Sequence, residues 1–108
     1  MIKTILTAAG LVEYETFRRA RFPSPPASSY AVYFDDVETD GSDYENLIKK
    51  HNYTVELYEL EPDDALEEAI EAALDALGLR WTKQDRYWLQ EEQRYQVIYE
   101  FEYIEKRR

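Results

Sequence analysis

Apolar residues in the middle of the chain recur first at every second position and then at helical spacing. In residues 52–60, Tyr53, Val55 and Leu57 alternate with more polar neighbours, a period of two that is typical of a half-buried strand. In residues 62–77, the apolar positions fall on one face of a helix. These positions are Leu66, Ile70, Ala73, Leu74 and Leu77. The sequence therefore predicts a strand that leads directly into an amphipathic helix at the centre of the fold.

Residues that favour helix ends flank this apolar stripe. Pro62 fits the first helical position, because its missing N–H would have no partner there anyway. Asp63 and Asp64 follow in the first turn, where the positive end of the helix dipole favours carboxylates. Gly78 supplies the left-handed residue that commonly closes a helix. We therefore expect the helix to span residues 62–77.

The polar face of this helix is acidic. It carries Glu67, Glu68, Glu71 and Asp75, and no Lys or Arg occurs in residues 61–77. One interpretation is a solvated face that aids solubility. The other is an anionic surface that binds a basic partner. The sequence leaves both open.

The remaining patterns predict a second helix and further strands. Ile2, Ile5, Leu6 and Ala9 share a helical face, and Gly10 offers a stop, so a first helix is expected over residues 2–9. Further strands are expected at residues 12–17, 30–34, 79–83, 86–89 and 95–106. The segments 79–83 and 86–89 form one strand with an interruption near Gln84-Asp85, and 95–106 is the closing strand.

Two polar segments are predicted as loops. Residues 22–29 hold three prolines and cannot continue a helix or a central strand. Residues 35–50 form the longest polar stretch, with a possible helical turn at 44–49, and we expect this loop to be ordered by assembly. Residues 36–41 match the start of a calcium loop, but Leu47 stands where a bidentate Glu is required, so a solvated turn is favoured.

Together these elements predict one α+β domain covering residues 1–108. We expect a mostly antiparallel sheet of about four to five strands with two helices packed on it, in the order α-β-β-β-α-β-β. The chain is long enough for a modest core, and its 44% hydrophobic content excludes a disordered chain.

Charge and composition exclude several classes of function. A formal charge of −10 argues against sequence-specific nucleic-acid binding and against anionic membranes. The chain has no cysteine, and no run resembles a signal peptide or a membrane span, so we expect it in a cytoplasm or in a particle assembled there.

No catalytic pattern is evident. The single histidine, His51, has no nucleophile motif around it and is interpreted as a surface or edge residue. No glycine-rich phosphate loop occurs among three glycines. We therefore expect no enzyme activity, no metal and no cofactor.

Some sequence features resemble a known family. They are Pro25-Pro26 ahead of Tyr30-Ala31-Val32-Tyr33, residues 51–58 leading into the acidic helix, and residues 95–106 as the closing strand. With the element order, these resemble the tail-completion or tail-terminator proteins of long-tailed bacteriophages, the group similar to minor tail protein U. The resemblance implies a structural subunit without catalytic residues that forms a ring, commonly a hexamer, at the end of the tail tube. It also implies contact with other tail or head–neck proteins, and a location in the virion tail and, during assembly, in the bacterial cytoplasm.

Clusters of opposite charge offer a route to such a ring. If the clusters lie on opposite flanks, copies can dock head to tail and close into a ring. The residues expected at the subunit interface are Arg18, Arg19, Arg21, Glu67, Glu68, Glu71, Asp75, Lys106, Arg107 and Arg108. The alternative is an acidic inhibitor, an immunity protein or nucleic-acid mimic that blocks a basic site on another protein.

Overall fold

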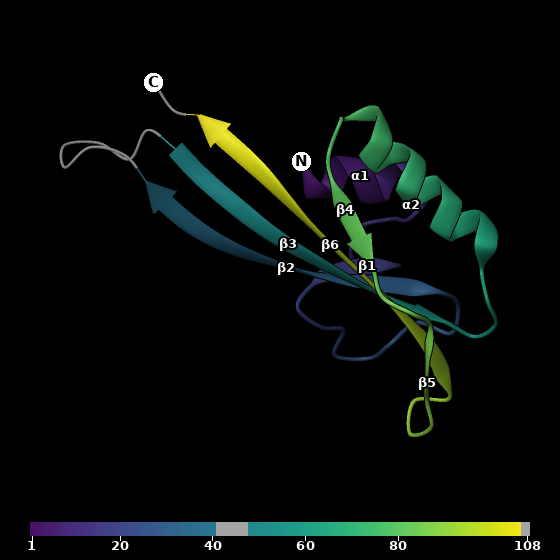
Figure 1. The fold of residues 1–108 in the computed structure, drawn as a ribbon. Helices are drawn as coiled ribbons and strands as arrows, with labels where there is room; N and C mark the ends of the chain where they lie inside the picture. Colours follow the sequence, from purple (N-terminus) through teal and green to yellow (C-terminus); the bar gives the residue numbers. More distant parts are fainter. Residues whose placement is uncertain (41–47, 107–108) are drawn as a thin grey trace.

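Two helices cover one face of a six-stranded sheet in the computed structural model, which describes residues 1–40 and 48–106 (Figure 1). The elements are α1 (Ile2–Ala8), β1 (Phe17–Arg19), β2 (Tyr30–Asp40), β3 (Ile48–Glu59), α2 (Asp64–Ala76), β4 (Trp81–Lys83), β5 (Tyr87–Leu89) and β6 (Arg94–Lys106). The strand order is β1-β2-β3-β6-β4, and β5 also pairs with β6. The pair β1–β2 is parallel and the others are antiparallel. The α+β class is confirmed, and the sheet is mostly antiparallel as expected, with one parallel pair; the expected four to five strands are corrected to six.

The central strand and helix form largely as their patterns predict. Helix α2 begins two residues later than expected, because Asp63 is its N-cap and accepts a hydrogen bond from the Leu66 N–H at 3.2 Å. Pro62 therefore precedes the cap and is not the first helical residue. At the other end, Gly78 adopts φ +70°, and the Leu79 N–H donates to the Leu74 carbonyl.

The hydrophobic core lies between the helices and one face of the sheet. Along β3, the buried residues recur at every second position, as expected for Tyr53, Val55 and Leu57. The largest fully buried apolar or aromatic side chains are Tyr99, Phe17, Ile5, Leu6, Leu57, Ile70, Leu74, Val55 and Val97. They come from both helices and from β1, β3 and β6, so all these elements contribute to one core.

The expected strand at residues 12–17 is wrong. Residues 14–16 form a turn, and β1 begins only at Phe17. The Thr16 hydroxyl accepts a hydrogen bond from the Val12 N–H at 2.8 Å, and Tyr14 takes φ +68°. A local side-chain bond therefore replaces strand pairing. Val12 and Tyr14 are exposed, so their alternation with acids does not reflect burial.

The expected long loop at residues 35–50 is also corrected. Residues 35–40 continue β2, and residues 48–50 begin β3, with Glu38 paired to Lys50. Residues 41–47, which include Leu47 and most of the expected helical turn, lie outside the described residues. Together with the end of β6, these extensions form an arm of three strands, residues 34–40, 48–53 and 101–106, that continues past both helices (Figure 1).

The proline-rich loop lies against the sheet face that the helices leave open. Its Phe22 ring meets Tyr30 edge to face at 5.3 Å. The Arg94 guanidinium donates to the carbonyls of Ser28 and Pro26 at 2.7 and 2.9 Å. The loop is thus fixed by a side chain from β6, as a stiff connection without regular structure. Within the described residues, neither helix has the length and apolar character needed to cross a bilayer.

Candidate functional site

The arm has two strand edges without a neighbour in the described part of the chain. On one side, β1 pairs only with residues 31–33 of β2, so residues 34–40 have no strand beside them. On the other side, β4 reaches only to Phe101 of β6, so from residue 102 onward no described strand lies beside β6 on the side away from β3. A bare edge presents a row of backbone donors and acceptors that can pair with another chain.

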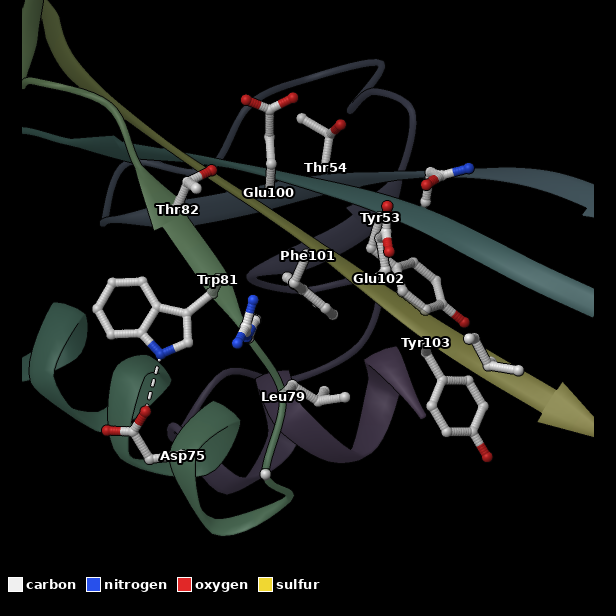
Figure 2. Close-up of a pocket in the computed structure, with 14 residues that line it drawn as sticks. Tyr53, Thr54, Asp75, Leu79, Trp81, Thr82, Glu100, Phe101, Glu102 and Tyr103 are labelled. Atoms are coloured by element: carbon white, nitrogen blue, oxygen red, sulfur yellow. Dashed lines mark hydrogen bonds between the residues drawn. The ribbon is translucent and has the colours of Figure 1, made fainter.

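A groove follows the bare edge of β6. It has a volume of about 1000 Å³. It lies beside Trp81, the first residue of β4, where the pairing of β4 with β6 stops at Phe101. Figure 2 shows Phe101 between Trp81 on one side and Tyr53 and Tyr103 on the other, with Leu79 below. Aromatic side chains beside unpaired backbone groups suit binding of an extended polypeptide.

A histidine links the three strands of the arm. In β3, His51 places Nδ1 2.9 Å from a carboxylate oxygen of Asp35 in β2 and Nε2 2.9 Å from one of Glu105 in β6. Its ring stacks on Tyr53 at 5.4 Å and lies 5.9 Å from Tyr103. Two carboxylates require an N–H on both ring nitrogens, which only the imidazolium provides. His51 therefore lies within a strand and ties three strands together, which its interpretation as a surface or edge residue did not anticipate.

The environment of this histidine shifts two pKa values upward. Burial alone lowers the pKa of His51, but hydrogen bonds to Glu105 and Asp35 outweigh it and raise that pKa above its usual value. Burial, assisted by the same two carboxylates, raises the pKa of Tyr53 to about 12. The strands of the arm are thus held by a charged hydrogen-bonded group.

The acidic face of α2 is largely paired with its own sheet. Glu67 is only 2% exposed and lies 2.8 Å from Lys83 and 2.7 Å from Arg86. Glu71 also contacts Lys83 at 2.8 Å and accepts a hydrogen bond from the buried Tyr99 hydroxyl. The expectation of an open acidic face is therefore wrong at Glu67, which is buried and paired within its own chain.

The two outer residues of that face remain accessible. Asp75 is exposed and accepts a hydrogen bond from the Trp81 indole at 2.8 Å, while Glu68 is exposed on the solvent side of α2. They leave an acidic flank beside β4 and the groove. This part of the predicted face can still meet a basic partner.

A bulge directs both cations toward the helix. Lys83 pairs with Tyr99 and Tyr87 pairs with Gln96, so residues 84–86 lie opposite residues 97–98. The extra residue shifts the alternation of side chains between the two faces of the sheet by one position. Arg86 therefore lies on the same face as Lys83, the face that α2 covers. The expected interruption near Gln84 is thus confirmed, and it builds the ion pairs of α2.

Glu59 is the most deeply buried acid of this cluster. Its side chain is fully buried, and no donor among the described residues makes a well-aligned hydrogen bond to either oxygen. The nearest cation is Arg86, whose Nε lies 3.5 Å from Oε1. Burial, followed by neighbouring Glu67, raises the pKa of Glu59 to about 8. The neutral form of Glu59 is therefore favoured over its usual balance, and in that form its proton can be donated to Glu67, whose pKa is lowered.

The basic residues of the predicted interface have different surroundings. Arg18 is half-buried, with its guanidinium over the rings of Tyr14 and Phe22 at 5.3 and 5.9 Å. Arg19 and Arg21 are exposed at and just beyond the end of β1. At the other end of the chain, Lys106 is the last residue of β6, and Arg107 and Arg108 lie outside the described residues.

The sheet order separates the opposite charges. Strand β1, with its arginines, forms one edge of the sheet, and β4 forms the other edge beneath the acidic helix. We call the edge formed by β1 the basic flank, defined by Arg18, Arg19 and Arg21; the bare edge of β2 on the same side carries acids, among them Asp36 and Glu38. The side with α2, β4 and the bare edge of β6 is the acidic flank, defined by Glu68 and Asp75. The arginines of β1 therefore lie toward the opposite edge of the sheet from Glu68 and Asp75, whereas Lys106 ends β6, on the side of the acidic flank.

The fold and these surfaces define a small α+β protein with two open, oppositely charged flanks and an arm with two open strand edges. A scan against models of protein families and a search of curated proteins both found no match to this chain.

Sequence reasoning missed the bare edges, His51 and Glu59. A usable signal existed for the last two, because His51 and Glu59 share the odd-numbered positions of Tyr53, Val55 and Leu57 and so face the same side of β3. No sequence pattern indicates the bare edges, because β2 and β6 are left uncovered only where the short neighbouring strands β1 and β4 stop. The partial calcium motif at residues 36–41 falls mainly in a strand, and no three His, Cys, Asp or Glu side chains of residues 1–40 and 48–106 are grouped to hold a metal.

Proposed function

We propose that the protein is a structural subunit that assembles head to tail into a ring, of the kind that ends the tail tube of a long-tailed bacteriophage and joins it to the head. The supporting observation is the presence of two different, complementary flanks at opposite edges of one sheet. Because the two flanks differ, a copy that docks through one flank still offers its other flank to a further copy. Such heterologous contacts close into a ring when the rotation between neighbours permits.

Charge orients this contact and sheet surface supplies its burial. The exposed Arg19 and Arg21 of the basic flank would face the exposed Glu68 and Asp75 of the acidic flank in the next copy. Charges of this kind set orientation and encounter rate more than affinity. The aromatic groove beside β6 provides apolar area for the same contact.

Light scattering at low and high salt tests the proposal. We expect an oligomer at about 0.05 M salt that dissociates toward about 1 M, because the screening length falls from about 10 Å at 0.1 M to about 3 Å at 1 M. Equal monomer mass at every salt concentration contradicts it.

A charge exchange sharpens the test. Arg19→Glu and Glu68→Lys should each weaken the oligomer, and mixing the two variants should restore contacts between unlike copies. The matched control is Glu91→Lys, which makes the same change of charge in the exposed turn between β5 and β6. If Glu91→Lys weakens the oligomer as much as Glu68→Lys, net charge rather than the acidic flank controls assembly.

The alternative, an acidic inhibitor of a basic protein, is favoured by a different observation. Asp36, Glu38 and Glu102 lie exposed on the arm face opposite the helices, Glu100 lies exposed just before the arm, and Lys50 pairs with Glu102 at 3.2 Å. An inhibitor of this kind should bind a cationic protein one to one and stay monomeric in its absence. Mass measurement of the isolated protein separates the two proposals.

A further inference from the structure

We propose that neighbouring copies join through their arms, with the bare edge of β2 in one copy added as a strand beside the bare edge of β6 in the next. This inference rests on the proposed ring and specifies its contact. The observations that carry it are two edges, on opposite sides of the same three-stranded arm, that no described strand covers. Each such contact pairs the β2 edge of one copy with the β6 edge of the next. The resulting dimer still has one free β2 edge and one free β6 edge, so further copies can be added.

The two edges are matched in position along the arm. Glu38 of β2 pairs with Lys50 of β3, which pairs with Ile104 of β6, so Glu38 and Ile104 lie at the same level and on the same sheet face. The bare stretches, residues 34–40 and 102–106, therefore run side by side along most of the arm. An added strand would meet an edge of similar length at either side.

Symmetry fixes the direction of the new pair. Strands β2 and β6 both run antiparallel to β3, so they run in the same direction. Rotation about a ring axis keeps the direction of a strand along that axis. The β2 strand of the next copy would therefore add parallel to β6, and the arms would form one continuous sheet around the ring.

Hydrogen bonds at the paired ends of these edges show which backbone groups point outward. The Gln84 N–H donates to the Ile98 carbonyl, so even-numbered residues of β6 direct their backbone groups away from β3. The Ala31 N–H donates to Thr16, so odd-numbered residues of β2 point outward. By this alternation, Ile104 and Val37 each direct outward an N–H that no strand of residues 1–40 and 48–106 accepts.

Proline at these two positions blocks one edge at a time. Both side chains are exposed, 55% for Ile104 and 43% for Val37, and neither N–H is used in pairing with β3. Ile104→Pro removes the β6 edge and Val37→Pro removes the β2 edge, while each leaves the other edge intact. We expect each variant alone to be monomeric, and an equimolar mixture to form heterodimers and nothing larger.

The controls keep side-chain loss apart from edge loss. Ile104→Ala and Val37→Ala shorten the same side chains but retain the N–H, so both should still form the ring. Circular dichroism and thermal unfolding report whether each proline variant is folded.

A second measurement is independent of proline. Because the chain has no cysteine, Glu38→Cys combined with Ile104→Cys should give a ladder of disulfide-linked copies, and each single variant should give at most a linked pair.

Crosslinks in that double variant must join different copies. Positions 38 and 104 are two strand spacings apart in one copy, about 9–10 Å, which is too far for a disulfide. If this double variant gives no ladder, Asp36→Cys can replace Glu38→Cys to allow for a shifted register. The absence of a ladder in both double variants would contradict strand addition.

The outcomes separate this inference from the proposed function. If the wild type forms rings and both folded proline variants still do, the arm contact is wrong and the ring stands. If Val37→Pro dimerises alone while Ile104→Pro does not, two β6 edges pair with each other, which also overturns the inference. If the wild type is a monomer under all conditions, the ring and the arm contact both fall.

Discussion

Single residues in this protein set two opposing ionisation states within one sheet. Glu59 is buried and favours its neutral form, since its pKa is raised to about 8. His51, in the same strand, is held between two carboxylates and favours its charged form. Both therefore bind a proton more tightly in the folded chain than in the unfolded chain. Their linked stability has the same sign: it is lost as the pH rises.

Glu59→Gln should remove part of this pH dependence. In the unfolded chain Glu59 titrates near its ordinary value of about 4.3, so the wild-type free energy of unfolding falls as pH rises from about 5 to 8, by at most about 1.4 kcal/mol per pH unit for this proton. The amide mimics the protonated acid and can donate to Glu67. We expect equal stabilities near pH 5 and a more stable variant at pH 8, measured by denaturant unfolding. Parallel pH curves for the two proteins would refute the neutral Glu59.

His51 should titrate above the ordinary histidine value of about 6.5. As the sole histidine of the sequence, it gives an isolated imidazole signal in an NMR titration. Asp35→Asn removes one of the two carboxylates and should lower its pKa. The stabilisation of the arm is fully present below about pH 6.5 and is lost as the pH rises through the folded pKa. A pKa at or below 6.5, or one unaffected by Asp35→Asn, is incompatible with the two-carboxylate bridge.

At the scale of elements, helix α2 is held against the sheet by its apolar stripe and by the ion pairs that Glu67 and Glu71 make beside that stripe. Leu74 is fully buried, whereas Leu77 of the same stripe is 46% exposed at the end of the helix. Leu74→Ala should lower the free energy of unfolding by about 2–5 kcal/mol, because it leaves a cavity in the core. Leu77→Ala, the same chemical change outside the core, should cost less than about 1 kcal/mol. Similar losses in denaturant unfolding would mean that the helix packs differently.

Local patterns predicted the elements well where the pattern itself reports burial. The alternation of Val55 and Leu57 gave β3, and the spacing of Ile70 and Leu74 gave α2. The prediction failed where pairing is non-local. Residues 35–40 are polar and form a strand because β3 extends beside them, which no local window reveals.

At the scale of the whole molecule, the sheet order decides which surfaces are free. Short β1 and β4 at the two edges leave the longer β2 and β6 uncovered in the arm, within the residues described. Natural proteins usually cover or charge such edges to prevent unwanted pairing. Both edges carry charged side chains, such as Glu38 and Glu102, and in the proposed ring each edge is in addition covered by the next copy.

The candidate surface could be predicted from sequence only in part. The charged clusters were visible as residue types, and Glu68 with Arg19 remains exposed. The burial of Glu67 was not predictable, because its partners Lys83 and Arg86 reach it only through the bulge and the antiparallel pairing with β6. Which acids stay free therefore depends on the fold.

Electron microscopy of the purified wild-type protein at low salt tests the central claim most directly. The head-to-tail account predicts closed rings with rotational symmetry, in which every copy uses both flanks. A field of particles no larger than a monomer, or dimers related by a two-fold axis, would contradict it.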